Sequence, residues 1–142
     1  MNKIINYTKG GFTVTTDKGK INIDVLYNSL HRSYWANNRS KETIVKSIEN
    51  SLCFSMYKGD KQIGFARVIT DYATFAYLCD VYIDEDYRGN GLGIWLLECI
   101  LNYPDLLELR KWLLATKDAH DLYRKFGFNE LATPERYMEI VN

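Results

Sequence analysis

Three glycines within five residues, in the segment Arg88-Gly89-Asn90-Gly91-Leu92-Gly93, separate two apolar stretches of different character. Residues 74–83 before them are rich in aromatic and β-branched side chains and favour a strand. Residues 94–101 after them carry apolar side chains at helical spacing. At such a strand-to-helix turn, backbone N–H groups and the helix dipole point at one place, and glycines let an anion come close. The segment therefore predicts an anion-binding turn, to which Arg88 adds a charged donor.

Two common glycine motifs do not fit this turn. A dinucleotide fingerprint that starts at Gly89 needs a glycine where Ile94 stands, and an acidic residue where the next predicted strand ends at Ala115. A P-loop needs lysine and then serine or threonine after its last glycine, but Ile94 and Trp95 follow Gly93. The residues leave two interpretations open, an anion site of another family or a tight turn without a ligand.

The remaining apolar stretches predict a mixed α/β sheet. Two strands, residues 52–57 and 62–69, flank a short glycine-containing turn and are expected to pair antiparallel. The strand at 74–83, the helix after the glycines, which Pro104 closes, and a strand at 109–115 form a β-α-β crossover. We expect one domain over residues 1–142, with helices on both faces of the sheet. The other expected elements are strands at 12–16, 128–131 and 137–141, helices at 23–30, 40–48 and 119–126, and a loop at 31–36.

Composition limits the classes of partner. Lysine plus arginine and aspartate plus glutamate number 18 each, so no overall field favours nucleic acid. The three cysteines, Cys53, Cys79 and Cys99, are widely spaced among apolar residues, which favours a reducing compartment over a disulfide framework or a metal site. The chain begins without the apolar run of a signal peptide and contains no stretch long enough for a membrane span. We expect a cytoplasmic protein that binds neither membrane nor metal and is a monomer or a homodimer.

Two segments together resemble the GNAT acetyltransferase superfamily. The glycine turn is similar to motif A of that family, Q/R-x-x-G-x-G/A, with Arg88, Gly91 and Gly93 in the defining places. About thirty residues downstream, the stretch 118–128 resembles motif B, A-x-x-L-Y-x-x-x-G-F, although Thr116 stands where the family often has asparagine. The order of the predicted elements also matches, so the resemblance covers roughly residues 62–128.

The resemblance implies a GNAT-like fold that binds acetyl-CoA as acyl donor and transfers the acetyl group to an amine on a small molecule or a peptide. The strand before the turn would hydrogen-bond pantetheine through its backbone, and the loop amides would hold the diphosphate. These implied cofactor-binding residues are Val81, Ile83, Arg88, Gly89, Asn90, Gly91, Leu92 and Gly93.

Acetyl transfer also needs a proton for the departing thiolate, an oxyanion site and a base. The resemblance places Tyr123 beside the CoA sulfur as the acid, and the amide of Val81 at the oxyanion. A purely structural role for Tyr123, as an aromatic residue of the core, stays open. Cys79 stands where the family often has glutamate, which leaves neighbouring Asp80 as the candidate base. An aspartate in an apolar strand is costly to bury unless it is paired or used, so a structural hydrogen-bonding role for Asp80 stays open.

The weaker candidates are side chains without a motif. His31 and His120 are possible bases, and Asp71 with the acidic run 84–86 is a possible attractant for a cationic amine. The expected aromatic wall of an acceptor pocket is Tyr34, Trp35, Tyr72 and Tyr77. Two other functions remain: a CoA-binding module without turnover, and a nucleotide or nucleic-acid binder that the charge balance disfavours.

Overall fold

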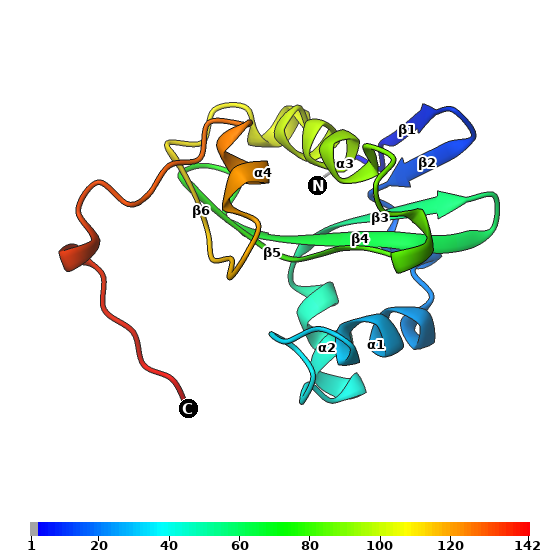
Figure 1. The fold of residues 1–142 in the computed structure, drawn as a ribbon, viewed down its shortest axis with the longest axis horizontal. Coiled ribbons are helices and arrows are strands. Elements are labelled where there is room, and N and C mark those ends of the chain that lie inside the picture. The colour runs from blue at the N-terminus through cyan, green and yellow to red at the C-terminus, as the bar shows by residue number, and fades with distance from the viewer. Residues whose placement is uncertain (1–2) are drawn as a thin grey trace.

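In the computed structural model, which describes residues 3–142, one mixed sheet runs through the molecule in the strand order β1-β2-β3-β4-β5-β6 (Figure 1). Every neighbouring pair is antiparallel except the last, β5 with β6, which is parallel. This is the expected arrangement of antiparallel strands followed by one crossover. The strands are β1 (Asn6–Lys9), β2 (Phe12–Thr15), β3 (Leu52–Lys58), β4 (Lys61–Thr70), β5 (Phe75–Ile83) and β6 (Lys111–Leu114).

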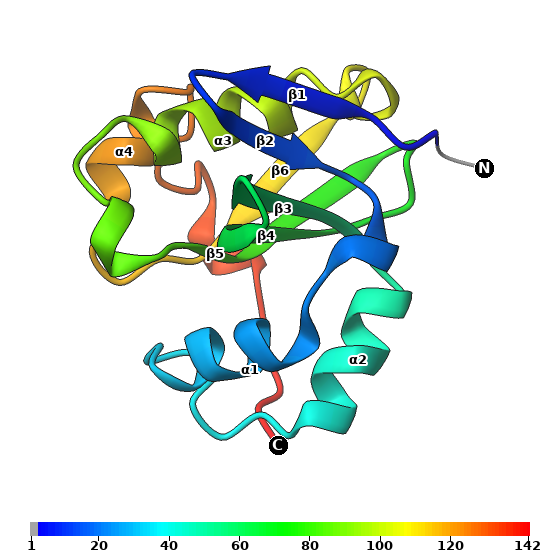
Figure 2. The ribbon, with the colours of Figure 1, turned by 90° about the vertical axis from the view of Figure 1, so that its right-hand side faces the viewer.

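Helices cover both faces of the sheet, as expected (Figures 1 and 2). On one face lie α1 (Ile23–His31) and α2 (Lys41–Glu49), and on the other lie α3 (Leu92–Leu101) and α4 (His120–Arg124). The side chains of Asn22 and Ser40 accept hydrogen bonds from backbone amides at the starts of α1 and α2 and so fix where these helices begin. Short 3-10 helices lie at Lys18–Lys20, Glu85–Tyr87, Pro104–Leu106 and Pro134–Arg136.

Each face has its own apolar core. The apolar sides of α1 and α2, including Leu26, Leu30 and Ile44, pack in one cluster with Phe65 of the sheet. The larger cluster on the other face contains Leu96 of α3. The sheet is therefore a rigid layer held from both sides, and the loops at its ends are positioned by it. No helix in the part of the chain described is long and apolar enough to cross a membrane.

The structure differs from the sequence-based expectations at both ends of the chain. The first strand, Asn6–Lys9, was not predicted, because its side chains are mostly exposed and show no apolar alternation. The strands expected at residues 128–131 and 137–141 are not formed. Strand-like composition is not sufficient there, because a strand needs a neighbour with which to exchange backbone hydrogen bonds, and in this structure neither segment pairs with one.

Candidate active site

A β-bulge interrupts β5 next to the predicted site. Phe65 of β4 pairs with Tyr82 and Arg67 pairs with Cys79, so the two residues Asp80 and Val81 lie opposite one. Asp80 adopts a φ of 53°, which is rare outside glycine and costs about 1–3 kcal/mol. Bulges of this kind re-aim side chains and backbone groups.

The bulge changes which residues face the open side of β5. The Thr74 carbonyl accepts a hydrogen bond from Arg110 on the β6 side, whereas the Asp84 amide donates to Ile63 of β4. Residues 74 and 84 are an even number of positions apart, so in a regular strand their main-chain groups would face the same neighbouring strand. The extra residue in the bulge explains why one faces β6 and the other faces β4. Beyond the bulge, the main-chain groups of Val81 and Ile83 therefore face away from β4.

The two parallel strands also separate at this point. Pairing between β5 and β6 ends at Leu78 and Leu114, while β5 continues to Ile83. Beyond the last paired residues, residues 79–81 and 115–118 line a common pocket, and Val81 is one of the two residues that the family resemblance assigns to pantetheine. The other is Ile83, whose carbonyl already accepts a hydrogen bond of 2.8 Å from Arg88 Nε.

The glycine turn follows β5 after the short 3-10 helix Glu85–Tyr87. Gly89 and Gly91 have φ values of 83° and 77°, and Gly91 caps α3. A side-chain carbon built on Gly89, Gly91 or Gly93 would meet no atom within 4 Å, so the space in front of the turn is open. At the first turn of a helix, the leading N–H groups have no partner within the helix. The predicted order of a strand, a glycine turn and a helix is confirmed, and the turn is open in front of its glycines.

A pocket of about 590 Å³ brings together the residues predicted for chemistry. Asp80 and Val81 line it from β5, and Tyr123 lines it from α4. Tyr34, Trp35 and Tyr77 form its aromatic wall, as expected, whereas Tyr72 does not line it.

Asp80 is buried, and both of its carboxylate oxygens accept hydrogen bonds. Its carboxylate accepts hydrogen bonds from Trp35 Nε1 at 2.9 Å, Arg39 Nη1 at 2.7 Å and Arg67 Nε at 2.9 Å. Only 4% of the residue is exposed, and both arginines are largely buried. The carboxylate therefore connects the bulge, through hydrogen bonds, with the loop that contains Trp35 and Arg39.

These two arginines were missed by the sequence reasoning. Arg67 had a signal, because it is the one charged residue inside an otherwise apolar stretch, 62–69, beside the strand that holds Asp80. Arg39 had none, since its approach depends on the path of the loop after α1.

Tyr123 sits at the junction of two cavities. It lines the pocket of Asp80 and also a groove beside β6. The pKa of its phenol is raised to about 12, mainly by burial and to a lesser extent by the nearby Tyr34. The hydroxyl is thus protonated throughout the neutral range and available as a donor.

Of the two histidines, only His120 lines a cavity together with Tyr123, the groove beside β6. Nε2 of His31 is 3.0 Å from the Arg39 carbonyl, its ring packs on Tyr27, and His120 is an exposed residue at the start of α4. Neither lines the pocket of Asp80 and Tyr123. Asp71 is also occupied, by the backbone of the β4–β5 turn. Within residues 3–142, no group of three or more histidine, cysteine, aspartate or glutamate side chains is placed to hold a metal ion.

Comparisons with known proteins agree with this geometry. The model of the acetyltransferase (GNAT) domain matches residues 49–130. A Gibberella zeae protein named as an acetyltransferase is 29% identical, over 84% of this chain and 80% of its own length. A GNAT-family structure from Xanthomonas campestris is 37% identical, covers 95% of this chain and 96% of that chain, and has a TM-score of 0.91.

A further solved structure shares the fold. It is a GNAT-family acetyltransferase from Elizabethkingia anophelis with acetyl-CoA bound, 19% identical, with a TM-score of 0.65 over 92% of this chain and 88% of that chain. The domain model itself spans more than half of the present chain. The protein therefore belongs to the GNAT acetyltransferase family and is an acyltransferase.

Proposed function

We propose that this protein is an N-acetyltransferase that passes the acetyl group of acetyl-CoA directly to a primary amine in a ternary complex. The observation that carries the proposal is the continuity of the site. Val81 lines the pocket with Tyr123, β5 continues past its last pairing with β6 as far as Ile83, and the open glycine turn follows β5 along the chain.

The donor would lie along that path. The amides of residues 89–93 are suited to the diphosphate, because the turn is unobstructed and begins a helix. The pantetheine arm would then follow β5, where the main-chain groups of Val81 and Ile83 face the opening. We assign Arg88 mainly to holding the end of β5, since its Nε donates to the Ile83 carbonyl.

The reaction needs three events at the thioester. The nitrogen of the neutral amine attacks the carbonyl carbon, and the negative charge that develops on oxygen is held by the Val81 amide. The C–S bond then breaks and the amide product forms. The thiolate leaves with a hydrogen bond from the Tyr123 hydroxyl and takes up a proton, while the amine nitrogen loses one to water.

Asp80 is better suited to positioning than to proton abstraction. An ionised carboxylate has about four acceptor sites, and two guanidinium groups and an indole use three of them. Of the two roles left open by the sequence, the geometry favours the hydrogen-bonding one. We propose that Asp80 holds Trp35 and Arg39 as one wall of the acceptor pocket.

A cationic amine is the acceptor that the neighbouring surface favours. A second cavity, of about 730 Å³, shares Tyr34 and Trp35 with the first. Its acidic lining residues are Asp84, Glu85, Asp86 and Asp118, against the basic residues Arg32 and Arg88. Excess negative charge in a cleft concentrates cations near it.

Two measurements on the purified protein test the proposal. Calorimetry should detect binding of CoA, and free thiol should appear when acetyl-CoA is mixed with a panel of polyamines, amino sugars and peptides. Absence of CoA binding to the folded protein would overturn the proposal. Binding of CoA without thiol release for any acceptor would instead support the module without turnover.

A further inference from the structure

The cavity of Asp80 and Tyr123 and the second, acidic cavity meet at three residues. Tyr34, Trp35 and Asp118 line both cavities, and no other residue in the described part of the chain does. We call these three residues the doorway, because they lie where one cavity joins the other. Aromatic rings and carboxylates are the groups that bind cationic amines, so the doorway has the composition of a cation site.

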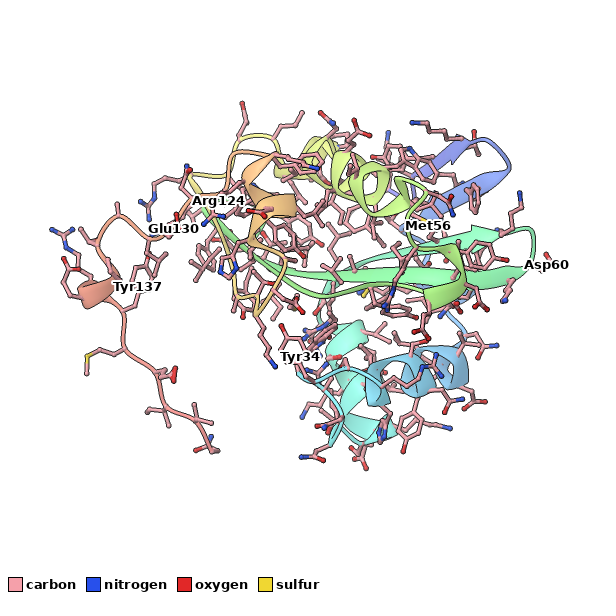
Figure 3. All side chains as sticks on the ribbon, in the orientation of Figure 1. Tyr34, Met56, Asp60, Arg124, Glu130 and Tyr137 are labelled. Atoms are coloured by element: carbon pink, nitrogen blue, oxygen red, sulfur yellow. The ribbon has the colours of Figure 1, made fainter. Side chains whose placement is uncertain are left out.

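The aromatic side of the doorway is held in place. The indole Nε1 of Trp35 donates to Asp80, and the ring of Tyr34 meets that of Trp35 edge-on, with centroids 5.1 Å apart. The Tyr34 hydroxyl accepts a hydrogen bond of 2.9 Å from the amide of Lys117. Tyr34, labelled in Figure 3, therefore connects the loop after α1 with the loop between β6 and α4, and this contact fixes the residue next to Asp118.

Asp118 is the free member of the doorway. The turn around it is shaped by Thr116, whose hydroxyl accepts a hydrogen bond of 3.1 Å from the amide of Ala119. The side chain of Asp118 itself is exposed, and within residues 3–142 it takes part in no hydrogen bond or ion pair. Asp80, in contrast, is held by two arginines and an indole. Of the two carboxylates that line the cavity of Tyr123, only Asp118 is available to a ligand.

The two cavities differ in charge. In the cavity of Tyr123 the basic side chains are in excess, and its charged residues are Arg39, Arg67, Lys117, Asp80 and Asp118. In the second cavity the acidic side chains are in excess. Positive surroundings disfavour the protonated form of an amine, and negative surroundings favour it. The first cavity therefore suits an uncharged amine, and the second suits an ammonium group.

An ion pair between Asp118 and the reacting nitrogen would oppose the reaction. A nearby carboxylate favours the protonated form of an amine, but only the neutral form has the lone pair that attacks a thioester. Asp118 is therefore suited to a different positive group of the acceptor, one that stays charged at the doorway while the reacting nitrogen lies deeper.

We infer that the acceptor is a primary amine with a second cationic group, and that Asp118 binds this second group while the neutral amine reaches the thioester beside Val81 and Tyr123. The inference rests on the proposed acetyl transfer and assigns its substrate class. Asp118 takes part in binding alone, so the bonds that form and break are those of acetyl transfer as described above.

Paired acceptors test this inference. The diamines from 1,3-diaminopropane to 1,6-diaminohexane are compared with the monoamines from propylamine to hexylamine, each pair with the same number of carbons, and thiol release is followed. At least one diamine should have a kcat/KM on the order of 10-fold above that of its monoamine, the scale of one charge-assisted contact. A diamine also has two reactive ends and a larger neutral fraction, so the preference must be measured in a variant as well.

That variant is Asp118→Asn. It should lose most of the diamine preference through a higher KM, with kcat and the kinetics of the monoamine kept. It should also unfold at the temperature of the unaltered protein, because the Asp118 side chain has no partner to lose. The matched control is Asp105→Asn, an exposed aspartate that lines neither cavity and whose loss changes the net charge equally. The control should keep the diamine preference.

Two results would overturn the inference and leave the proposed function standing. One is thiol release that is as fast with monoamines as with diamines, and the other is an unchanged KM for the preferred diamine in Asp118→Asn. Failure of the proposed function has a different signature. In that case CoA does not bind, or no thiol appears with any acceptor, and the assignment of Asp118 fails with it.

Discussion

Tyr123 combines deep burial with a place on the wall of the proposed thioester pocket. If its hydroxyl serves the departing thiolate, Tyr123→Phe should leave the Kd for acetyl-CoA unchanged and lower kcat on the order of 10²-fold, the usual scale for a positioned acid. Stopped-flow thiol detection and calorimetry measure the two quantities. Tyr103→Phe is the matched control, since Tyr103 is also buried with a pKa raised to about 12 but lies outside the pocket. Equal kcat values for Tyr123→Phe and the unaltered enzyme would remove the proposed role.

Asp80 is the residue at which stability and activity can be separated. Replacing it by asparagine leaves two largely buried guanidinium groups without their charge partner, which typically costs about 3–5 kcal/mol. We expect urea unfolding of Asp80→Asn to show a loss of this size. The exposed pair of Lys41 and Asp24 provides the control, because Asp24→Asn should cost less than about 1 kcal/mol.

The activity of Arg39→Gln then decides between the two roles of Asp80. A positioning carboxylate predicts that Arg39→Gln loses turnover nearly as much as Asp80→Asn, because both release the Trp35 loop. A catalytic base predicts that Asp80→Asn is inactive while Arg39→Gln stays active, whatever stability either variant loses. That second pattern would restore the base assignment.

At the scale of elements, the turn before α3 depends on the openness of its backbone. Gly91→Ala places a side chain at a φ of 77°, which costs about 1 kcal/mol of stability, and also fills the space in front of the amides. Gly59→Ala, at a φ of 58° in the β3–β4 turn, introduces the same backbone strain at a position outside the glycine turn. Both variants should lose similar stability in thermal unfolding. Only Gly91→Ala should lose CoA affinity in calorimetry. Equal CoA affinities for Gly91→Ala and Gly59→Ala would mean that the diphosphate binds elsewhere.

Gly93→Ala completes this series. Gly93 lies in the first turn of α3 without a positive φ, and an added carbon there meets no atom within 4 Å. The motif that this turn resembles also accepts alanine at that place. Alanine should therefore keep CoA affinity and raise stability by up to about 1 kcal/mol. Loss of CoA binding in Gly93→Ala would mean that the phosphates come closer to α3 than the open space suggests.

The elements that could be predicted from sequence are those with a clear apolar pattern. The β3–β4 hairpin and the crossover through α3 follow from periodicity and turn chemistry, and both are confirmed. The strand β1 could not be found this way, because it is held by backbone pairing with β2 and buries little. The segment 137–141 shows the converse, a strand-like composition that pairs with no strand in this structure.

In the candidate site, the local backbone geometry could be predicted from sequence, but the partners of Asp80 could not. Glycines and a tyrosine at fixed spacing point to a local backbone geometry, and that geometry is found. The partners of Asp80 depend on how a loop from one face meets a bulge in the sheet. A local pattern contains no such information, although a buried carboxylate does require a cation somewhere.

At the scale of the whole molecule, burial of weak acids predicts a loss of stability in alkali. Burial raises the pKa of Cys53 to about 12 and those of Cys79 and Cys99 to about 11 in the folded protein, whereas unfolded thiols ionise near pH 9. Between roughly pH 9 and 11 the unfolded chain therefore binds fewer protons than the folded one, so the free energy of unfolding falls as pH rises, by up to about 4 kcal/mol per pH unit for three thiols. Urea unfolding under reducing conditions should give similar stability at pH 7.5 and 8.5 and a steep decline above pH 9. Cys53→Ser, which removes one titrating group, should make the decline shallower whatever its effect at neutral pH. A stability that stays level to pH 10.5, or an unchanged slope in Cys53→Ser, would show that these thiols ionise as readily in the folded protein as in the unfolded chain.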